Sequence, residues 1–429
     1  MRGITMAGIS KMDGGGRPPR ACPIRRVVLA AVAAAVLGAC GDGGSDYVPS
    51  ANVAEGDAAF AQVLREKLLD ARPGDVIEVP PGRYSFDRGL SLRVDNVTLR
   101  GAGQDKSVLS FKGQKAGAEG LLVNASHFTI ENLAIEDAKG DGLKVNEGEH
   151  ITIRGVRVEW TGGPDTGNGG YGLYPVKTRN VLIEDSIAIG ASDAGIYVGQ
   201  SREVIVRNNR AEYNVAGIEI ENTVNADVHG NLATNNTGGI LVFNMPALEQ
   251  PGGNIRVFGN RVVANNTANF GAKGTPVASV PAGSGVVINS NDDVEIFDND
   301  IQDNKTANII VSSVYSTGYK DDSRSDSFDP YPERISVHGN RLSGGGDAPD
   351  GLDLKALKVS VYGLRGRFPD VLWDGYLNTD LEGGPQICLR DVSGVINADG
   401  PGGYKNPSQD LAGHDCRLPQ LPTVDLRRG

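Results

Sequence analysis

The 429-residue sequence predicts an all-β fold, a right-handed parallel β-helix built as a three-sided solenoid. Three observations lead to this expectation. The chain contains 59 glycines, which is about twice the usual share. It repeats a short glycine-led apolar strand, and a second apolar strand alternates with the first. A Gly-X-Y period and long helical tracts are missing from the sequence, which excludes collagen and helical bundles.

The glycine-led strand recurs at a nearly constant interval. Its first apolar residue stands at positions 143, 173, 196, 218, 240, 286 and 309, and four of these six steps are 22 or 23 residues long. The second strand, for example Phe128–Ile130 or Val204–Val206, falls between successive copies. With a third short apolar pair, each period forms one coil. We expect the coils to stack, because a single coil cannot bury its own apolar face.

Asparagines recur at two positions of the repeat. The first series is Asn209, Asn231, Asn260, Asn299 and Asn340, and the second is Asn214, Asn236, Asn265 and Asn304. Asparagine tolerates left-handed backbone geometry at corners, and stacked side-chain amides can hydrogen-bond along a column. We therefore expect these residues to form structural ladders, not a functional site.

The N-terminal region resembles a bacterial lipoprotein signal. Arg25 and Arg26 precede an apolar run that ends in Leu37-Gly38-Ala39-Cys40. This pattern makes residues 1–39 a signal peptide, Cys40 the lipidation site and residues 40–56 a flexible tether. An ordinary secretory signal with an incidental cysteine is the alternative. Gly41, where an aspartate would retain a lipoprotein at the inner membrane, favours the outer membrane, facing the periplasm or the cell surface.

The remaining boundaries follow from the limits of the repeat. Apolar residues at helical spacing between Asp57 and Ala71 predict a helix that caps the first coil. The β-helix is expected over residues 57–343, and residues 344–429, which lose the repeat, are expected to form an irregular C-terminal cap. Cys388 and Cys416 lie in this cap, and an oxidising envelope compartment favours a disulfide between them.

The net charge narrows the classes of partner. The chain carries −11, and removal of residues 1–39, with six Lys or Arg and one Asp, leaves −16. An acidic chain of this kind is not expected to bind nucleic acid. Contact with a membrane is expected through the lipid anchor only.

Two kinds of motif give the chain a resemblance to a known superfamily. The segment Pro73-Gly74-Asp75-Val76-Ile77-Glu78-Val79-Pro80-Pro81-Gly82-Arg83-Tyr84 and the Asn/Gly coils make residues 57–343 similar to pectate-lyase-like right-handed β-helices. Stretches 163–171 and 192–200 resemble bacterial β-helix lipoproteins of unassigned function, which are paired with another envelope protein. The resemblance implies an envelope or carbohydrate context. The Asp-Pro-His and Gly-His-Gly motifs of related epimerases and polygalacturonases are absent from the sequence.

Candidate catalytic residues lie on the outward side of the glycine-led strands. Because strand side chains alternate, the residue after each inward Leu or Ile points outward, and stacking places these residues in one column: Lys144, Tyr174, Tyr197 and Glu219. A polysaccharide lyase or epimerase would use a tyrosine as base or acid, Lys144 to neutralise the substrate carboxylate and Glu219 to orient. A glycosidase would instead pair Glu219 with Asp193 or Glu221.

Substrate-binding residues are expected beside this column. Asp141 and Asp193 precede the strands, and Glu221 follows Glu219 by two residues. The insertion 159–171 carries Trp160, which suits stacking on a sugar ring. Exposed β-sheet faces also favour Tyr, Lys and Glu, so an ordinary surface is the alternative.

No cofactor is expected, although one loop could hold Ca²⁺. Asp321, Asp322, Asp326 and Asp329 cluster there, and a solvated acidic loop is the alternative. His127 and His150 occupy equivalent corners of adjacent coils and could stack or bind a metal. Asn180 and Glu203 continue that column, which favours a structural corner.

Two functions of different classes remain open. The first is a lipid-anchored envelope protein that binds a polysaccharide or a paired envelope protein on its solenoid face. The second is a carbohydrate-active enzyme, a lyase, epimerase or glycosidase, with a groove along the column from Lys144 to Glu219. The missing family motifs favour the first slightly.

Overall fold

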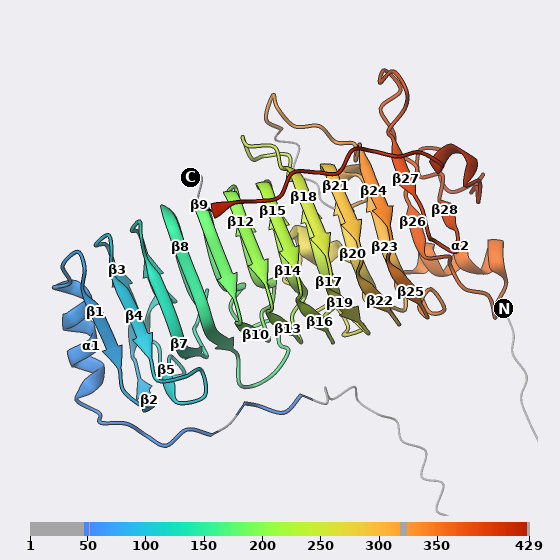
Figure 1. Ribbon diagram of the computed structural model, residues 1–429. Coiled ribbons are helices and arrows are strands. Elements are labelled where there is room, and N and C mark those ends of the chain that lie inside the picture. The colour runs from blue at the N-terminus through green and yellow to red at the C-terminus, as the bar shows by residue number, and fades with distance from the viewer. Residues whose placement is uncertain (1–46, 51, 318–323, 427–429) are drawn as a thin grey trace, which may run out of the picture. The chain divides into compact units, whose positions relative to one another are not determined.

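The computed structural model describes residues 47–50, 52–317 and 324–426. The contacts of the chain divide it into Met1–Gly44 and Ser45–Gly429, and every described residue belongs to the second unit. The expected signal peptide and lipidation site Cys40 lie outside the described residues. The second unit forms the expected right-handed parallel β-helix, with coils stacked from α1 (Phe60–Leu69) at one end to β28 (Val395–Asn397) at the other (Figure 1).

Each complete coil contributes one strand to each of three parallel sheets, which we call sheets A, B and C. Sheet A consists of β3 (Arg88–Leu92), β6 (Ala116–Val123), the first parts of β8 (Leu143–Glu159) and β9 (Tyr171–Glu184), β11 (Ala194–Gly199), β14 (Ala216–Glu221), β17 (Gly238–Phe243), β20 (Ser284–Asn289), β23 (Ala307–Ser312), β26 (Val371–Trp373) and β28.

Sheets B and C are built in the same way. Sheet B consists of β1 (Val76–Val79), β4 (Thr98–Gly101), β7 (Thr129–Glu136), later parts of β8 and β9, β12 (Arg202–Arg207), β15 (Val224–His229), β18 (Gly253–Phe258), β21 (Asp292–Phe297), β24 (Ile335–His338) and β27 (Ile387–Leu389). Sheet C consists of β2 (Gly82–Ser85), β5 (Ser107–Ser110), the ends of β7 and β8, β10 (Ile187–Ile189), β13 (Arg210–Glu212), β16 (Leu232–Thr234), β19 (Arg261–Val263), β22 (Asp300–Gln302) and β25 (Arg341–Ser343).

The core lies inside the coils, where alternate side chains of all three sheets meet. Along sheet A the inward residues Leu143, Leu173, Ile196, Ile218 and Ile240 are register partners, and each is 0% exposed. Burying each of these side chains stabilises the fold by about 1.5–3 kcal/mol before the entropy of ordering is counted. The inward positions predicted from the alternation are therefore confirmed.

Both expected asparagine ladders are present at the corners of the coils. Asn231 Nδ2 donates to Asn260 Oδ1 at 3.0 Å, and the same bond links the other members of the first series. The second series is linked in the same way, for example from Asn214 to Asn236 at 3.0 Å. The left-handed backbone, however, lies one residue earlier, for example at Asn208 (φ 56°). The ladder residues therefore supply buried amide bonds, and their neighbours make the turn.

Residues before the first coil are docked on the solenoid, which differs from the flexible tether expected over residues 40–56. The Tyr47 hydroxyl and the Ser50 backbone N–H both donate to the Glu159 carboxylate, the latter at 2.9 Å. Residue 56 continues this docking, since the Gly56 N–H donates to the Arg83 carbonyl at 2.9 Å. The buried carboxylate of Glu159 gives this segment a fixed partner that composition alone does not reveal.

The two ends of the solenoid are closed differently. The N-terminal helix is confirmed as α1, whose buried Leu64 and Leu68 cover the first coil. Past residue 343 the sheets continue, because β26 and β28 extend sheet A and β27 extends sheet B. The expected boundary was too early, since the insertion that carries α2 (Leu352–Tyr362) interrupts the period without ending the fold. Cys388 and Cys416 form the expected disulfide.

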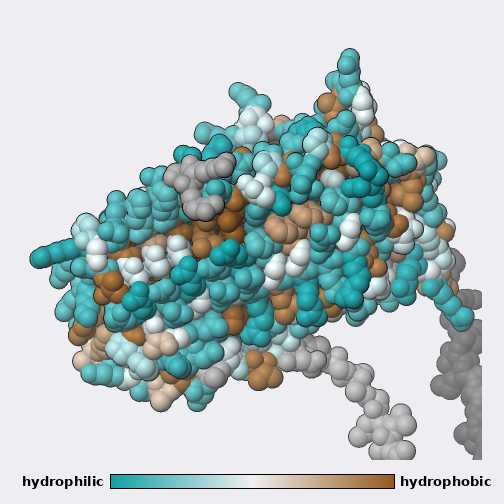
Figure 2. All heavy atoms as spheres, viewed as in Figure 1, coloured by the Kyte–Doolittle hydropathy of each residue, from teal (hydrophilic) through white to brown (hydrophobic). Residues whose placement is uncertain are grey.

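After this disulfide the chain turns back along sheet B (Figure 1). The backbone N–H groups of Leu421 and Val424 donate to Glu295 at 3.1 Å and to Asp227 at 3.3 Å. On the face shown in Figure 2, hydrophilic residues cover most of the surface. Neither α1, α2 nor any other helix in the described ranges is long and apolar enough to cross a bilayer.

Candidate functional site

Sheet A brings the four predicted column residues together. The register pairs Lys144 with Tyr174 and Tyr197 with Glu219. The rings of Tyr174 and Tyr197 have centroids 4.9 Å apart. Lys144 Nζ lies 4.6 Å from the centroid of the Tyr174 ring and 3.9 Å from Asp141 Oδ2. The column thus exists as a structure, while the catalytic roles of its members stay predictions.

Flanking residues complete the arrangement, and one of them was missed by the sequence reasoning. The Tyr171 ring lies 4.5 Å from the rings of both Tyr174 and Tyr197. The Tyr197 hydroxyl donates to Glu221 Oε1 at 2.6 Å. Tyr171 could have been noticed in the sequence, because it stands before the glycine of its strand, where the paired strand has the small residue Ala194. We call the following eight residues the acid–tyrosine cluster: Asp141, Lys144, Tyr171, Tyr174, Asp193, Tyr197, Glu219 and Glu221.

Burial within the cluster is uneven, which differs from the exposed face that was expected. Lys144 and Tyr174 are half-buried, but Tyr197 is only 4% exposed and Glu219 only 3%. Glu219 is followed along the same column by the buried apolar residue Leu241. Segments from outside the repeat cover this part of sheet A, including η1 (Pro276–Ser279) and α2, which pack their apolar side chains on it. Glu219 lies between its register partners Tyr197 and Leu241, which both belong to this second hydrophobic cluster.

The enclosed position of Glu219 is electrostatically unfavourable for a charged carboxylate. Its Oε2 atom has no hydrogen-bond partner among the described residues. Burial, followed by the negative charges of Asp193 and Glu221, raises the pKa of Glu219 well above its usual range. Burial and the neighbouring acids therefore favour the neutral, protonated form of Glu219 over the charged form.

Three half-buried carboxyl groups of the cluster titrate close to neutrality. Burial and the nearby Glu221 raise the pKa of Asp193 to about 7. Burial also raises the pKa of Glu221 to about 7, against the hydrogen bond from Tyr197. Burial raises the pKa of Asp141 to about 6, although Lys144 opposes the shift. Carboxyl groups with such values can both donate and accept protons at neutral pH.

The tyrosines of the cluster are neutral hydroxyl groups. Burial and the charge of Asp141 raise the pKa of Tyr174 to about 12. Burial raises the pKa of Tyr197 and of Tyr171 above the usual range as well. Tyr174 can therefore donate a hydrogen bond, but it is a poor base at neutral pH. This result weighs against the expected use of a tyrosine as the base.

A pocket of about 330 Å³ adjoins the cluster on the same outward face of sheet A. It begins at Phe243, the register partner of Glu221, and Leu354 of α2 forms another wall. Its floor consists of the apolar residues Val287 and Ile310, and Asp374 adds a carboxylate. The pocket is lined by segments outside the repeat, among them residues 278–281, 316–317 and 350–354, and by none of the residues of the insertion 159–171.

Trp160 does not join the cluster. Its side chain is 4% exposed and packs with the core inside the coils. The indole Nε1 donates to the Ala138 carbonyl at 2.7 Å, so the ring is fixed at the corner that follows sheet C. The expectation that Trp160 stacks on a sugar is wrong, because the large apolar ring gains more from filling the corner than from facing solvent.

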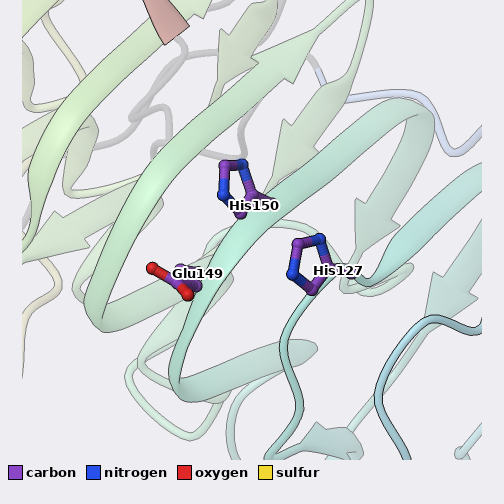
Figure 3. Close-up of side chains that lie close together, drawn as sticks. All are labelled: His127, Glu149 and His150. Atoms are coloured by element: carbon purple, nitrogen blue, oxygen red, sulfur yellow. The ribbon is translucent and has the colours of Figure 1, made fainter. Parts of the chain in front are cut away.

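His127 and His150, at equivalent corners of adjacent coils, stack on each other, which is one of the two arrangements expected from the sequence. His127 and His150 have ring centroids 4.7 Å apart, and Glu149 lies beside them (Figure 3). One potential ligand atom from each of the three residues lies within 4.8 Å of the others, so a metal could be held here. Both histidines take positive φ angles, as do Asn180 and Glu203 in the same column. The shared left-handed backbone supports the structural corner.

Comparison with known proteins places the fold. Residues 93–249 match the family described as a right handed beta helix region. The A-module of a mannuronan C-5 epimerase from Azotobacter vinelandii shares 18% identity at a TM-score of 0.45, over 76% of this chain and 89% of that one. An alginate lyase from a Paenibacillus species shares 15% identity at a TM-score of 0.35, over 66% of this chain and 96% of that one. No curated protein matches the chain in sequence.

These likenesses concern the general architecture and carry no information about activity. The family match falls on the coils from β4 to β17, where the glycine-led repeat is most regular. The two asparagine ladders and the three parallel sheets agree with it. The chain is a right-handed parallel β-helix protein.

Proposed function

We propose that the chain is a carbohydrate-active enzyme that carries out acid–base chemistry at the acid–tyrosine cluster. One observation supports this most directly: Asp193, which directly precedes β11, and Glu221, the last residue of β14, each have a pKa raised to about 7. Burying several acids together is unfavourable for folding, so a structural role alone gives no reason to retain them. Glycoside hydrolysis fits this pair best, because it needs one neutral acid and one carboxylate.

The roles follow from charge and exposure. One carboxyl of the Asp193–Glu221 pair is protonated and donates its proton to the glycosidic oxygen as the carbon–oxygen bond breaks. The other, as a carboxylate, assists water, whose hydroxyl joins the anomeric carbon while its remaining proton passes to the carboxylate. Tyr197 is a positioning residue, since it donates to Glu221 at 2.6 Å and is buried. Glu219 is also buried, and we assign it no contact with substrate.

The half-buried residues are those that can meet a sugar. Tyr171 and Tyr174 offer ring faces, since their centroids lie 4.5 Å apart at the edge of the covered part of sheet A. Lys144 remains partly exposed and can donate to hydroxyl groups or to a substrate carboxylate. With one lysine among four acids, the cluster suits a neutral glycan better than a polyuronate.

The test is turnover of a panel of neutral and acidic polysaccharides by the purified chain, read as new reducing ends and as unsaturated products. We expect reducing ends without unsaturation. Asp193→Asn and Glu221→Gln should each lower the rate about 10²- to 10⁴-fold. Glu147→Gln, which changes an exposed acid of β8, is the matched control and should leave the rate unchanged.

Unsaturated products would replace hydrolysis with elimination at the same site. Activity that survives both Asp193→Asn and Glu221→Gln would show that the cluster is not the active site. Binding of a glycan without any turnover would support the second candidate, a non-catalytic binding protein. That candidate is favoured by one observation, the burial of Tyr197 and Glu219 at the centre of the column.

The proposed location rests on sequence alone. We propose that Cys40 carries a lipid and that the β-helix is held at a bacterial envelope membrane, where it meets polysaccharide or a paired envelope protein. The disulfide between Cys388 and Cys416 is compatible with such an oxidising compartment.

A further inference from the structure

Three carboxylates meet at the corner between sheets A and B, away from the acid–tyrosine cluster. Asp292 is the first residue of β21, and Asp329 and Glu333 belong to the insertion that precedes β24. One carboxylate oxygen from each residue lies within 4.8 Å of the other two. The insertion is already docked here, because the Glu333 N–H donates to Asp292 Oδ1 at 3.0 Å.

Among the described residues, one cation forms ion pairs with this group, and it is shared with a fourth carboxylate. The Arg334 guanidinium binds both oxygens of Asp293, at 2.7 and 2.8 Å. It lies farther from the group itself, at 3.5 Å from Asp292 Oδ2 and 3.6 Å from Glu333 Oε2. Asp329 forms no ion pair within the described ranges. Arg334 thus forms its hydrogen-bonded pair with Asp293 and longer ion pairs with Asp292 and Glu333, so one guanidinium faces four carboxyl groups.

Glu333 has a buried carboxylate oxygen without a hydrogen-bond donor in the described part of the chain. The residue is 4% exposed, and its Oε1 has no hydrogen-bond partner among the residues that the structure describes. A buried carboxylate oxygen without a donor costs about 1–3 kcal/mol or more, and a cation is the partner that would remove this cost.

We propose that Asp292, Asp329 and Glu333 bind a Ca²⁺ ion that fastens the insertion to the corner of the β-helix. The ligands are all oxygens, and they come from a strand end and a loop with no regular geometry. Ca²⁺ accepts such irregular sets of six to eight oxygens, with water and backbone carbonyls completing the shell, whereas Zn²⁺ and Cu²⁺ favour nitrogen or sulfur ligands.

This site differs from the calcium loop expected from the sequence. Of the four aspartates in that expectation, Asp321 and Asp322 lie outside the described residues, and Asp326 is exposed. Only Asp329 belongs to the group, and its partners come from elsewhere. The proposal does not depend on the proposed enzymatic function.

Binding here would stabilise one wall of the pocket on sheet A. Beside the group, Ser290 Oγ donates to the Pro330 carbonyl at 2.7 Å, and the Tyr331 ring lies 5.8 Å from that of Tyr315. Ser316 and Thr317, at the start of the same insertion, line the pocket. A bound ion would therefore hold the end of the insertion directly, and its start only through the contact between Tyr331 and Tyr315.

The test uses the purified chain after removal of bound metal with a chelator. Isothermal titration calorimetry with Ca²⁺ alone should show one site, and Ca²⁺ should raise the thermal unfolding midpoint. Glu333→Gln and Asp329→Asn should weaken Ca²⁺ binding at least about tenfold and remove the thermal shift. Circular dichroism without Ca²⁺ shows whether each variant is folded.

The matched control is Asp326→Asn, which removes an exposed acid from the same insertion. It should bind Ca²⁺ as the unchanged chain does. The proposal is overturned if the unchanged chain binds no Ca²⁺, if a folded Glu333→Gln binds it normally, or if Asp326→Asn abolishes binding. The last result would return the site to the exposed acidic loop.

Discussion

Side-chain alternation was sufficient to predict which residues share the column, but not how deeply each is buried. Lys144, Tyr174, Tyr197 and Glu219 follow from the two-residue period of a strand and the coil length. Tyr171 was missed because it stands where the repeat normally has a small residue. Segments far away in sequence, such as η1 and α2, add apolar side chains to the cluster that contains Tyr197 and Leu241, the register partners of Glu219. Composition and residue spacing do not predict contacts between segments so distant in sequence.

The raised pKa values of the cluster predict how stability depends on pH. Asp193 and Glu221 have folded-state pKa values of about 7, above the values of about 4 expected in the unfolded chain. The folded state therefore binds these protons more tightly, and the stabilisation present at low pH is lost as the pH rises to about 7 and beyond. We expect denaturant unfolding to show a free energy of unfolding that falls between pH 5 and pH 8.

Variants show whether this pH dependence of the free energy of unfolding comes from the cluster or from other carboxylates. Glu221→Gln should flatten the decline, since each such carboxyl contributes at most about 1.4 kcal/mol per pH unit. Glu147→Gln should follow the unchanged chain, because Glu147 is exposed. A Glu221→Gln profile parallel to that of the unchanged chain would contradict the assignment.

At the level of elements, regular repeats were predictable and the segments between them were not. Both asparagine ladders and the capping helix α1 follow from periodicity in the sequence. The position of the left-handed residue, one before each ladder asparagine, could not be predicted from the spacing and follows only from the backbone angles of the structure. The same limit explains why the β-helix continues past residue 343. The strand Val371–Trp373 is short and lacks the glycine that precedes most strands of sheet A, and it follows a long insertion.

The ladders make a quantitative prediction about stability. Asn260→Ala removes the amide that donates to Asn299 at 2.9 Å and accepts from Asn231 at 3.0 Å, and it leaves buried groups unpaired. We expect a loss of about 2–4 kcal/mol in the free energy of unfolding, measured in urea. Asn266→Ala, which removes a solvent-exposed amide bonded to Asp303, should cost less than about 1 kcal/mol. Equal losses in the two variants would mean that the ladder has no special role.

For the whole molecule, the sequence predicted the architecture because one simple unit is repeated. Each coil contacts mainly its neighbours, so knowledge of one period specifies most of the solenoid. Function is not repeated in this way. The acid–tyrosine cluster and the proposed calcium site each arise where single coils depart from the period, at Tyr171 and at the insertion before β24. Such departures from the period can be recognised in a sequence, but the residues that they contact in the fold cannot.

The proposed anchor predicts where the intact protein is found in a cell. Expressed in full in a Gram-negative host, the chain should fractionate with membranes and incorporate labelled palmitate. Cys40→Ser should abolish both, whereas Cys22→Ser, within the expected signal, should change neither. An unlabelled full-length chain secreted in soluble form would favour the ordinary secretory signal instead.

The returning C-terminal segment has a practical consequence. Because Val424 is hydrogen-bonded to Asp227 of β15, this part of the chain lies beside the middle coils and not at the last one. A fluorophore attached close to Val424 would therefore lie on the flank of the solenoid. It would report on events at sheet B, and it would leave the far end of the molecule free for immobilisation by other means.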